Sequence, residues 1–254
     1  MITQIAQIAR VEALLAKLQT TRFNALLPVT IEVRQKEGPQ NYLLKIGTKE
    51  ISTKTLLDLD VGSRYWGVMK EDRTTGVLNL SRLLKQPSLL KKAAFLPRFE
   101  APQLMEFLSK EHPKAEMKTL LLHQLAQSGS KSEFLTLTNM IAALNENLFT
   151  MVLQNEGQKT IVQFRKRRTG GKKGAKEEAS LEFYAAFVHL GPVKGLIESS
   201  EGNRKLTLYL YYENAMKLLE KELENLGFEG KILHSKTPIE PLYMPAPSLL
   251  DLKG

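Results

Sequence analysis

Cysteine is absent from the 254 residues of the chain, so disulfide bonds, thiolate metal sites and cysteine nucleophiles are excluded. No apolar run approaches the length of about 18 residues that a transmembrane helix needs. The N-terminus has neither the basic start nor the unbroken apolar core of a secretory signal. These absences together lead us to expect a cytoplasmic protein.

Motifs of catalysis and cofactor binding are also missing. The chain contains no Gly-x-Ser-x-Gly elbow, no Walker sequence and no dinucleotide-binding fingerprint. The chain has four histidines, which are His112, His123, His189 and His234, and they are not spaced as metal ligands are. We therefore predict a protein that is not an enzyme and has no cofactor and no metal. An active site built only from Asp, Glu and Lys of distant segments would leave no such motif.

The charge of the chain is concentrated in one place. The formal net charge is +9, and residues 165–176 hold seven basic residues and no acid. Removing those seven charges leaves +2 for the other 242 residues. The apolar fraction of 43% and the charged fraction of 25% are otherwise those of an ordinary globular protein. The basic excess is therefore a local feature.

Hydrophobic periodicity predicts an α+β fold divided into five segments. These are an N-terminal helix (1–27), a small antiparallel β-barrel (28–84), a helical middle segment (85–147), a C-terminal α+β domain (148–237) and a Pro-rich tail (238–254). The first helix is expected to pack on the following domain, to self-associate or to act as an export signal. The tail should form no regular structure. It either lies along the body of the protein or serves as an extended ligand.

The barrel prediction rests on five short alternating segments separated by turns, as in oligonucleotide-binding or SH3-like folds. Such a barrel offers three aromatic residues for base stacking, which are Tyr42, Tyr65 and Trp66. The cations beside them are Arg34, Lys45, Lys54, Arg64 and Lys70. Acidic residues are interleaved with these cations, and Trp66 suits a barrel core better than a binding surface. Nucleic-acid binding through the barrel and the basic segment is thus the alternative hypothesis.

The C-terminal domain is expected to contain a hairpin and then a β-β-α-β unit. Segments 148–153 and 160–164 predict two strands joined by a turn. Leucines alternate along 206–210 as in a half-buried strand. From Asn214 the apolar residues recur at helical spacing, and Gly227 is placed to end that helix.

The basic segment 165–176 contains three glycines and no large apolar residue, which predicts a mobile loop between strands. The loop is either solvated without a specific role or docks on an anionic surface, whether an acidic protein face, nucleic acid or phospholipid. The predicted partner-binding residues are Arg165, Lys166, Arg167, Arg168, Lys172, Lys173 and Lys176.

Two short motifs of the C-terminal domain carry a family resemblance. The first is Leu190-Gly191-Pro192-Val193, and the second is the helix pattern of Leu219, Leu223 and Leu226 followed by Gly227. With the order of elements around them, they resemble the C-terminal domain of the flagellar hook-length control family, over about residues 181–237. The sequence departs from that family at Phe187, where the family has proline. The Leu-x-x-Gly step at residues 59–62 gives the β region 29–84 a weaker resemblance.

The resemblance implies a protein-interaction factor of flagellar (type III) export. In that family the C-terminal domain contacts the export gate and switches it from hook to filament substrates. The expected partner is accordingly an export-gate component or another acidic protein surface, and export through the flagellar apparatus is an option. The chain has no long disordered stretch of the kind that family members use as a ruler, so length measurement itself is not implied.

Overall fold

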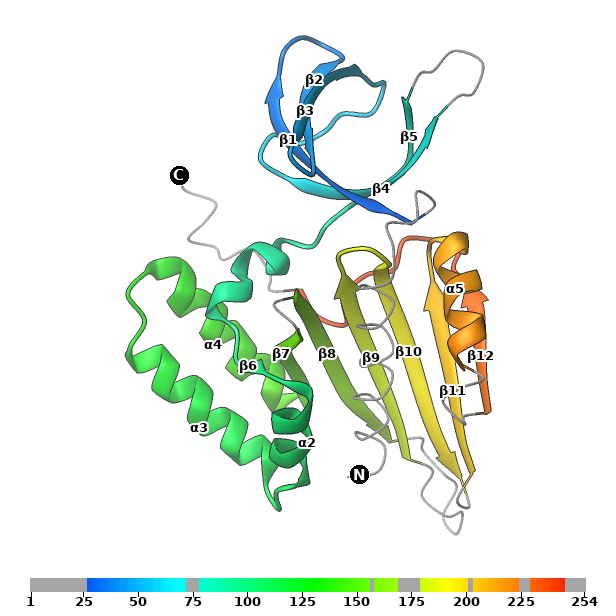
Figure 1. Cartoon of the computed structure of the whole chain (residues 1–254). Helices are drawn as coiled ribbons and strands as arrows, with labels where there is room; N and C mark the ends of the chain where they lie inside the picture. Colours follow the sequence, from blue (N-terminus) through cyan, green and yellow to red (C-terminus); the bar gives the residue numbers. More distant parts are fainter. Residues whose placement is uncertain are drawn as a thin grey trace.

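The structure is a computed structural model, and it describes residues 27–71, 78–155, 158–168, 179–200, 203–223 and 229–244. These residues form two sheets and a group of helices, and most strand pairs are antiparallel (Figure 1). The α+β prediction is therefore confirmed. The predicted N-terminal helix, 1–27, lies outside the described residues except for Leu27.

The first sheet has five strands in the order β3-β2-β1-β4-β5, all paired antiparallel. They are β1 (Val29–Lys36), β2 (Asn41–Ile46), β3 (Lys49–Lys54), β4 (Arg64–Glu71) and β5 (Leu78–Lys85). One face buries a small core made of Ile31, Val33, Tyr42, Leu44, Leu59 and Tyr65. The five predicted strands are thus present.

The predicted closure of these strands into a barrel is wrong, because β3 and β5 are the two edges of an open sheet. The reason lies in β4, which buries side chains on both of its faces. Tyr65 faces the small core, whereas Trp66 and Val68 belong to the larger core of the second sheet. Strand β4 is therefore shared between the two cores, and it lacks the solvent-facing outer side that it would have in a free-standing barrel.

The helical middle segment is confirmed. It contains η1 (Ser88–Phe95), β6 (Arg98–Phe99), α2 (Ala101–Ser109), α3 (Pro113–Ala126) and α4 (Lys131–Asn145). Local sequence sets these boundaries. A capping box formed by Glu100 and Gln103 begins α2, and the hydroxyl of Ser130 accepts a hydrogen bond from the Glu133 amide at the start of α4.

The second sheet has seven strands in the order β12-β11-β10-β9-β8-β7-β6. Its remaining elements are β7 (Leu148–Asn155), β8 (Gln158–Arg168), β9 (Ala179–Phe187), β10 (Gly191–Ser200), β11 (Asn203–Leu210), α5 (Glu213–Leu223) and β12 (Glu229–His234). The pairs β6–β7 and β11–β12 are parallel, and α5 connects the second pair. Ala215 and Leu219 of α5 are buried, as the helical spacing predicted.

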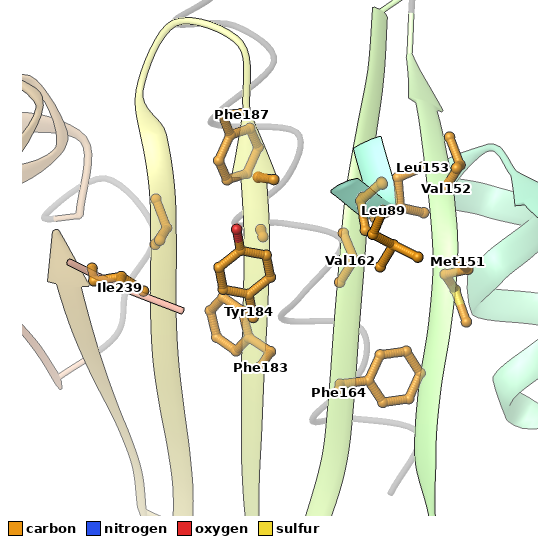
Figure 2. Close-up of a cluster of buried hydrophobic side chains, with 14 of the residues drawn as sticks. Leu89, Met151, Val152, Leu153, Val162, Phe164, Phe183, Tyr184, Phe187 and Ile239 are labelled. Carbon is orange, nitrogen blue, oxygen red and sulfur yellow. The ribbon is translucent and has the colours of Figure 1, made fainter. Parts of the chain in front are cut away.

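One hydrophobic core runs through the helices and the seven-stranded sheet. Figure 2 shows side chains of β7, β8 and β9 in this core, together with Leu89 of η1 and Ile239 from the chain after β12. The core is therefore continuous across the boundary that periodicity placed between residues 147 and 148.

The five-stranded sheet meets the seven-stranded sheet beyond the end of β9 (Figure 1). The Trp66 indole Nε1 donates a hydrogen bond of 2.9 Å to the carbonyl of Phe187, and the Tyr212 hydroxyl donates one of 3.1 Å to the carbonyl of Arg82. The Arg82 guanidinium pairs with Glu213 at 3.2 Å. Trp66, predicted as a barrel core residue, is buried instead at this junction.

The described part of the tail lies along the body of the protein and forms no helix or strand up to Met244. Ile239 is buried in the large core. The fully buried Gln163 amide donates a 2.8 Å hydrogen bond to the Tyr243 carbonyl and accepts one of 3.2 Å from the Tyr243 amide. One side chain of the sheet thus pairs with the tail as a neighbouring strand would.

The sequence predicted that a loop begins at residue 165, and this start is too early. Strand β8 continues to Arg168 and pairs with β9 through that residue. Four of the seven predicted binding residues, Arg165 to Arg168, are therefore in a strand, because pairing with β9 outweighs the mutual repulsion of their charges. Residues 169–178 lie outside the described part of the chain.

Candidate partner-binding groove

A groove of about 830 Å³ lies where the start of α3 faces β7, β8 and β9. It lies toward the opposite end of β9 from the five-stranded sheet, since it reaches Leu181 whereas Trp66 contacts Phe187. Three parts of the chain line it: residues 108–118, residues 145–149, and the strand residues Phe164, Lys166 and Leu181.

The floor of the groove is apolar. Phe149 of β7 and Phe164 of β8 are paired across the strands, and their rings stack with centroids 5.0 Å apart and an interplanar angle of 5°. Leu108 from the end of α2 and Leu181 of β9 extend this floor. Phe149 is only half-buried. A ligand seated here would therefore remove aromatic surface from water, which favours binding.

The rim is built around the beginning of α3. Pro113 is the first residue of that helix, where its missing amide hydrogen costs nothing. The Lys114 ammonium donates to the Asn145 carbonyl at 3.1 Å and to the Asn147 side-chain oxygen at 2.8 Å. Asn147 has a left-handed backbone, with φ of 61°, where asparagine is tolerated. These contacts fix the start of α3 against the end of α4.

The rim carries an excess of positive charge. Lys118 and Lys166 are exposed, and neither has a carboxylate partner among the described residues. The acid at the rim is Glu111, whose carboxylate lies 3.8 Å from the His112 ring. The amino end of α3 adds the partial positive charge of a helix N-terminus. The arrangement suits a ligand that combines apolar side chains with carboxylates.

The predicted binding residues are divided between the two faces of the sheet. Lys166 lines the groove, whereas Arg165 points to the opposite face because successive strand residues alternate. The side chains of Arg167 and Arg168 are outside the described part, as are Lys172, Lys173 and Lys176 entirely. Of the seven predicted residues, Lys166 is the one placed in the groove.

Arg165 belongs to an ion cluster with Glu182 and Lys194. Its Nε and one terminal nitrogen lie 2.8 Å from Glu182 Oε2, and Lys194 Nζ lies 2.8 Å from Glu182 Oε1. The Glu182 side chain is only 3% exposed. Burial alone would raise the pKa of Glu182, but the hydrogen bonds from Lys194 and Arg165 hold that pKa below its usual range. Arg165 is thus a structural residue.

The aromatic residues on which base stacking would depend are not accessible. Tyr42, Tyr65 and Trp66 are all buried in the two cores. The Tyr42 and Tyr65 hydroxyls hydrogen-bond Asp58 and Asp60 respectively. The five-stranded sheet therefore offers none of these rings as a platform for single-stranded nucleic acid.

Neither a metal site nor a membrane-spanning helix accompanies the groove in the described part of the chain. In the described ranges, no group of three or more His, Asp or Glu side chains is arranged to hold a metal ion. Among the described helices, none is both long enough and apolar enough to cross a membrane. Comparisons with protein-family models, with curated proteins and with solved structures gave no match.

Sequence reasoning missed most of the groove. Lys114, Lys118, Phe149 and Phe164 carry no local motif, and they come together only when β7 and β8 pair beside α3. One signal was present at Pro113, since a proline that begins a helix marks where that helix exposes its amino end.

Proposed function

We propose that this chain is a non-enzymatic protein-interaction factor of flagellar (type III) export, similar to hook-length control proteins, and that its groove docks an acidic, partly apolar segment of an export-gate component. The observation that supports docking is the stacked Phe149–Phe164 floor beside Lys118 and Lys166. Charge steers such a partner to the site, and burial of apolar surface holds it there.

The assignment to export rests on the resemblance of the C-terminal unit. In the structure the Leu190-Gly191 step leads into β10, which pairs with β11 before α5 and the parallel strand β12. This order of elements agrees with the one on which the resemblance was based. The proposed role is therefore the switch from hook to filament substrates, and measurement of hook length is not part of the proposal.

The test is a charge reversal at the groove with a matched control. Lys118→Glu combined with Lys166→Glu should weaken binding to purified export-gate components by roughly tenfold or more at low salt. Lys131→Glu combined with Lys217→Glu makes the same charge change at two exposed lysines away from the groove, and should leave binding nearly unchanged.

The same pair of variants is then examined in the flagellated host. Hook length and filament assembly should change in the groove variant alone. Normal hooks and filaments with unchanged binding would contradict the proposal. Tight binding of the wild type to single-stranded DNA, with a steep salt dependence, would favour the nucleic-acid function instead.

A further inference from the structure

The loop between β3 and β4, residues 55–63, exposes three aliphatic side chains. Leu56 is 87% exposed, and Leu57 and Val61 are each 55% exposed. Single exposed leucines are common on protein surfaces, but three aliphatic residues within six positions of one loop are a local excess. The loop belongs to the five-stranded sheet, at the end of the molecule remote from the groove (Figure 1).

The residues between these aliphatic side chains hold the loop to the sheet. Leu59 is buried in the small core. Asp58 accepts hydrogen bonds from the Lys36 ammonium at 2.9 Å and from the Tyr42 hydroxyl at 2.8 Å. Asp60 pairs with the Lys85 ammonium, and its backbone amide donates to the Tyr65 hydroxyl at 3.0 Å. Leu59 is thus packed in the small core, and both carboxylates have partners within the chain although the Asp58 and Asp60 side chains are 87% and 63% exposed.

The end of the loop is fixed as well. Gly62 has a left-handed backbone, with φ of 74°, and its amide donates to the Val33 carbonyl at 2.7 Å. Its carbonyl accepts a 2.6 Å hydrogen bond from the Lys91 ammonium. A loop tied at this many points cannot fold its leucines back onto the sheet, so Leu56, Leu57 and Val61 are held in the solvent.

The chemistry of the loop favours a lipid surface over a protein partner. Hot spots of protein interfaces are enriched in Trp, Tyr and Arg, and Leu and Val are under-represented there. Insertion into a bilayer needs only apolar volume, with cations near the head groups. Lys54 and Lys91 flank the loop and have no carboxylate partner among the described residues, while the charges of Asp58 and Asp60 are matched by Lys36 and Lys85.

We propose that the 55–63 loop is a membrane-docking loop, which inserts Leu56, Leu57 and Val61 into the surface of an anionic bilayer while Lys54 and Lys91 meet the lipid phosphates. This contact is peripheral and reversible, because three side chains bury little area. It is independent of the groove, which lies elsewhere on the molecule.

The test is sedimentation of the full chain with vesicles of phosphatidylcholine, alone or with roughly a third phosphatidylglycerol. The wild type should bind the anionic vesicles and bind the neutral vesicles less. Leu56→Ser with Leu57→Ser should lose binding by roughly tenfold or more. The matched control, Leu122→Ser with Phe134→Ser, alters two side chains that are 46% and 48% exposed on α3 and α4, and should bind as the wild type does.

Several outcomes would overturn the proposal. Absence of wild-type binding to anionic vesicles is the first. Equal losses in the loop variant and its control would show that apolar insertion is not specific to the loop. Loss in Lys118→Glu with Lys166→Glu, but not in the loop variant, would show adsorption through the groove cations. If the wild type binds no vesicles but the loop variant changes the phenotype of the host, the loop is assigned to a protein partner. Circular dichroism checks that each variant is folded.

Discussion

Replacing Arg165 by glutamine tests the division of the basic segment between two faces of one sheet. The neighbouring change Lys166→Gln removes the same charge one residue further along β8, so the two variants form a matched pair. In the structure the Arg165 guanidinium is bound to the buried Glu182 carboxylate, whereas Lys166 is exposed at the groove rim. The two changes should therefore differ in stability although they are identical in charge.

The size of the difference follows from the contacts. Removing one partner of a fully buried ion pair costs about 3 to 5 kcal/mol. Here Lys194 continues to pair with Glu182, and the Arg165 and Lys194 side chains are 36% and 41% exposed, so solvent screens the interaction. We expect Arg165→Gln to lower the free energy of unfolding by about 2 kcal/mol. Lys166→Gln should change it by about 0.5 kcal/mol at most.

The dependence of this stability on pH gives a second measurement. Because the folded pKa of Glu182 is held below its ordinary value of 4.5, the unfolded chain takes up the Glu182 proton at a higher pH than the folded chain. The stability that Glu182 contributes is fully present at pH values above its ordinary pKa. It is lost as the pH falls through the lower pKa of the folded state. Arg165→Gln removes part of the cause of the lowered pKa, so its stability should fall less steeply over the same acid range.

The assay is urea unfolding followed by fluorescence, for which the single tryptophan, Trp66, is well placed because it is buried at the junction of the two sheets. Circular dichroism on the same samples checks that the two probes report one transition. Equal stabilities of the Arg165→Gln and Lys166→Gln variants between pH 5 and 7 would refute the assignment of Arg165 to a structural cluster.

Three further substitutions test the packing of the fold by thermal or urea unfolding. Trp66→Phe removes the donor to the Phe187 carbonyl and should lower the free energy of unfolding by about 2 kcal/mol. An unchanged stability would mean that the junction between the two sheets contributes little. Gly195→Ala would place a Cβ atom 2.1 Å from the Phe183 ring, so we expect a loss of about 1 to 3 kcal/mol; a neutral result would show that the ring moves freely. Leu219→Ala should cost about 2 to 5 kcal/mol, and a value near zero would contradict the burial of α5.

Periodicity predicted the elements of this chain better than it predicted their assembly. The alternation at 206–210 and the helical spacing from Asn214 report local geometry, and β11 and α5 appear where those patterns indicate. Barrel closure depends on whether β3 meets β5, and no residue of either strand encodes that contact. The decisive side chain is Trp66, whose partner Phe187 lies 121 residues away.

The misplaced start of the basic loop has a related cause. Composition treats Arg165 and Lys166 as equivalent members of one cationic run, and it predicts repulsion and disorder. Glu182, which lies 17 residues away in the sequence, faces Arg165 across the β8–β9 pair and offsets one of those charges. The register of two strands, which composition does not contain, decides whether an arginine is paired or exposed.

The same alternation explains how one strand serves two purposes. Toward one face, Arg165 and Gln163 bind partners within the chain, namely Glu182 and the backbone of Tyr243. Toward the other face, the buried Phe164 ring forms part of the groove floor and Lys166 places an exposed cation at its rim. Strand β8 is therefore held in place by buried contacts on both faces, while Lys166 stays exposed to a partner. A docking surface of this kind needs no reordering of the strand on binding, which lowers the entropic cost of association.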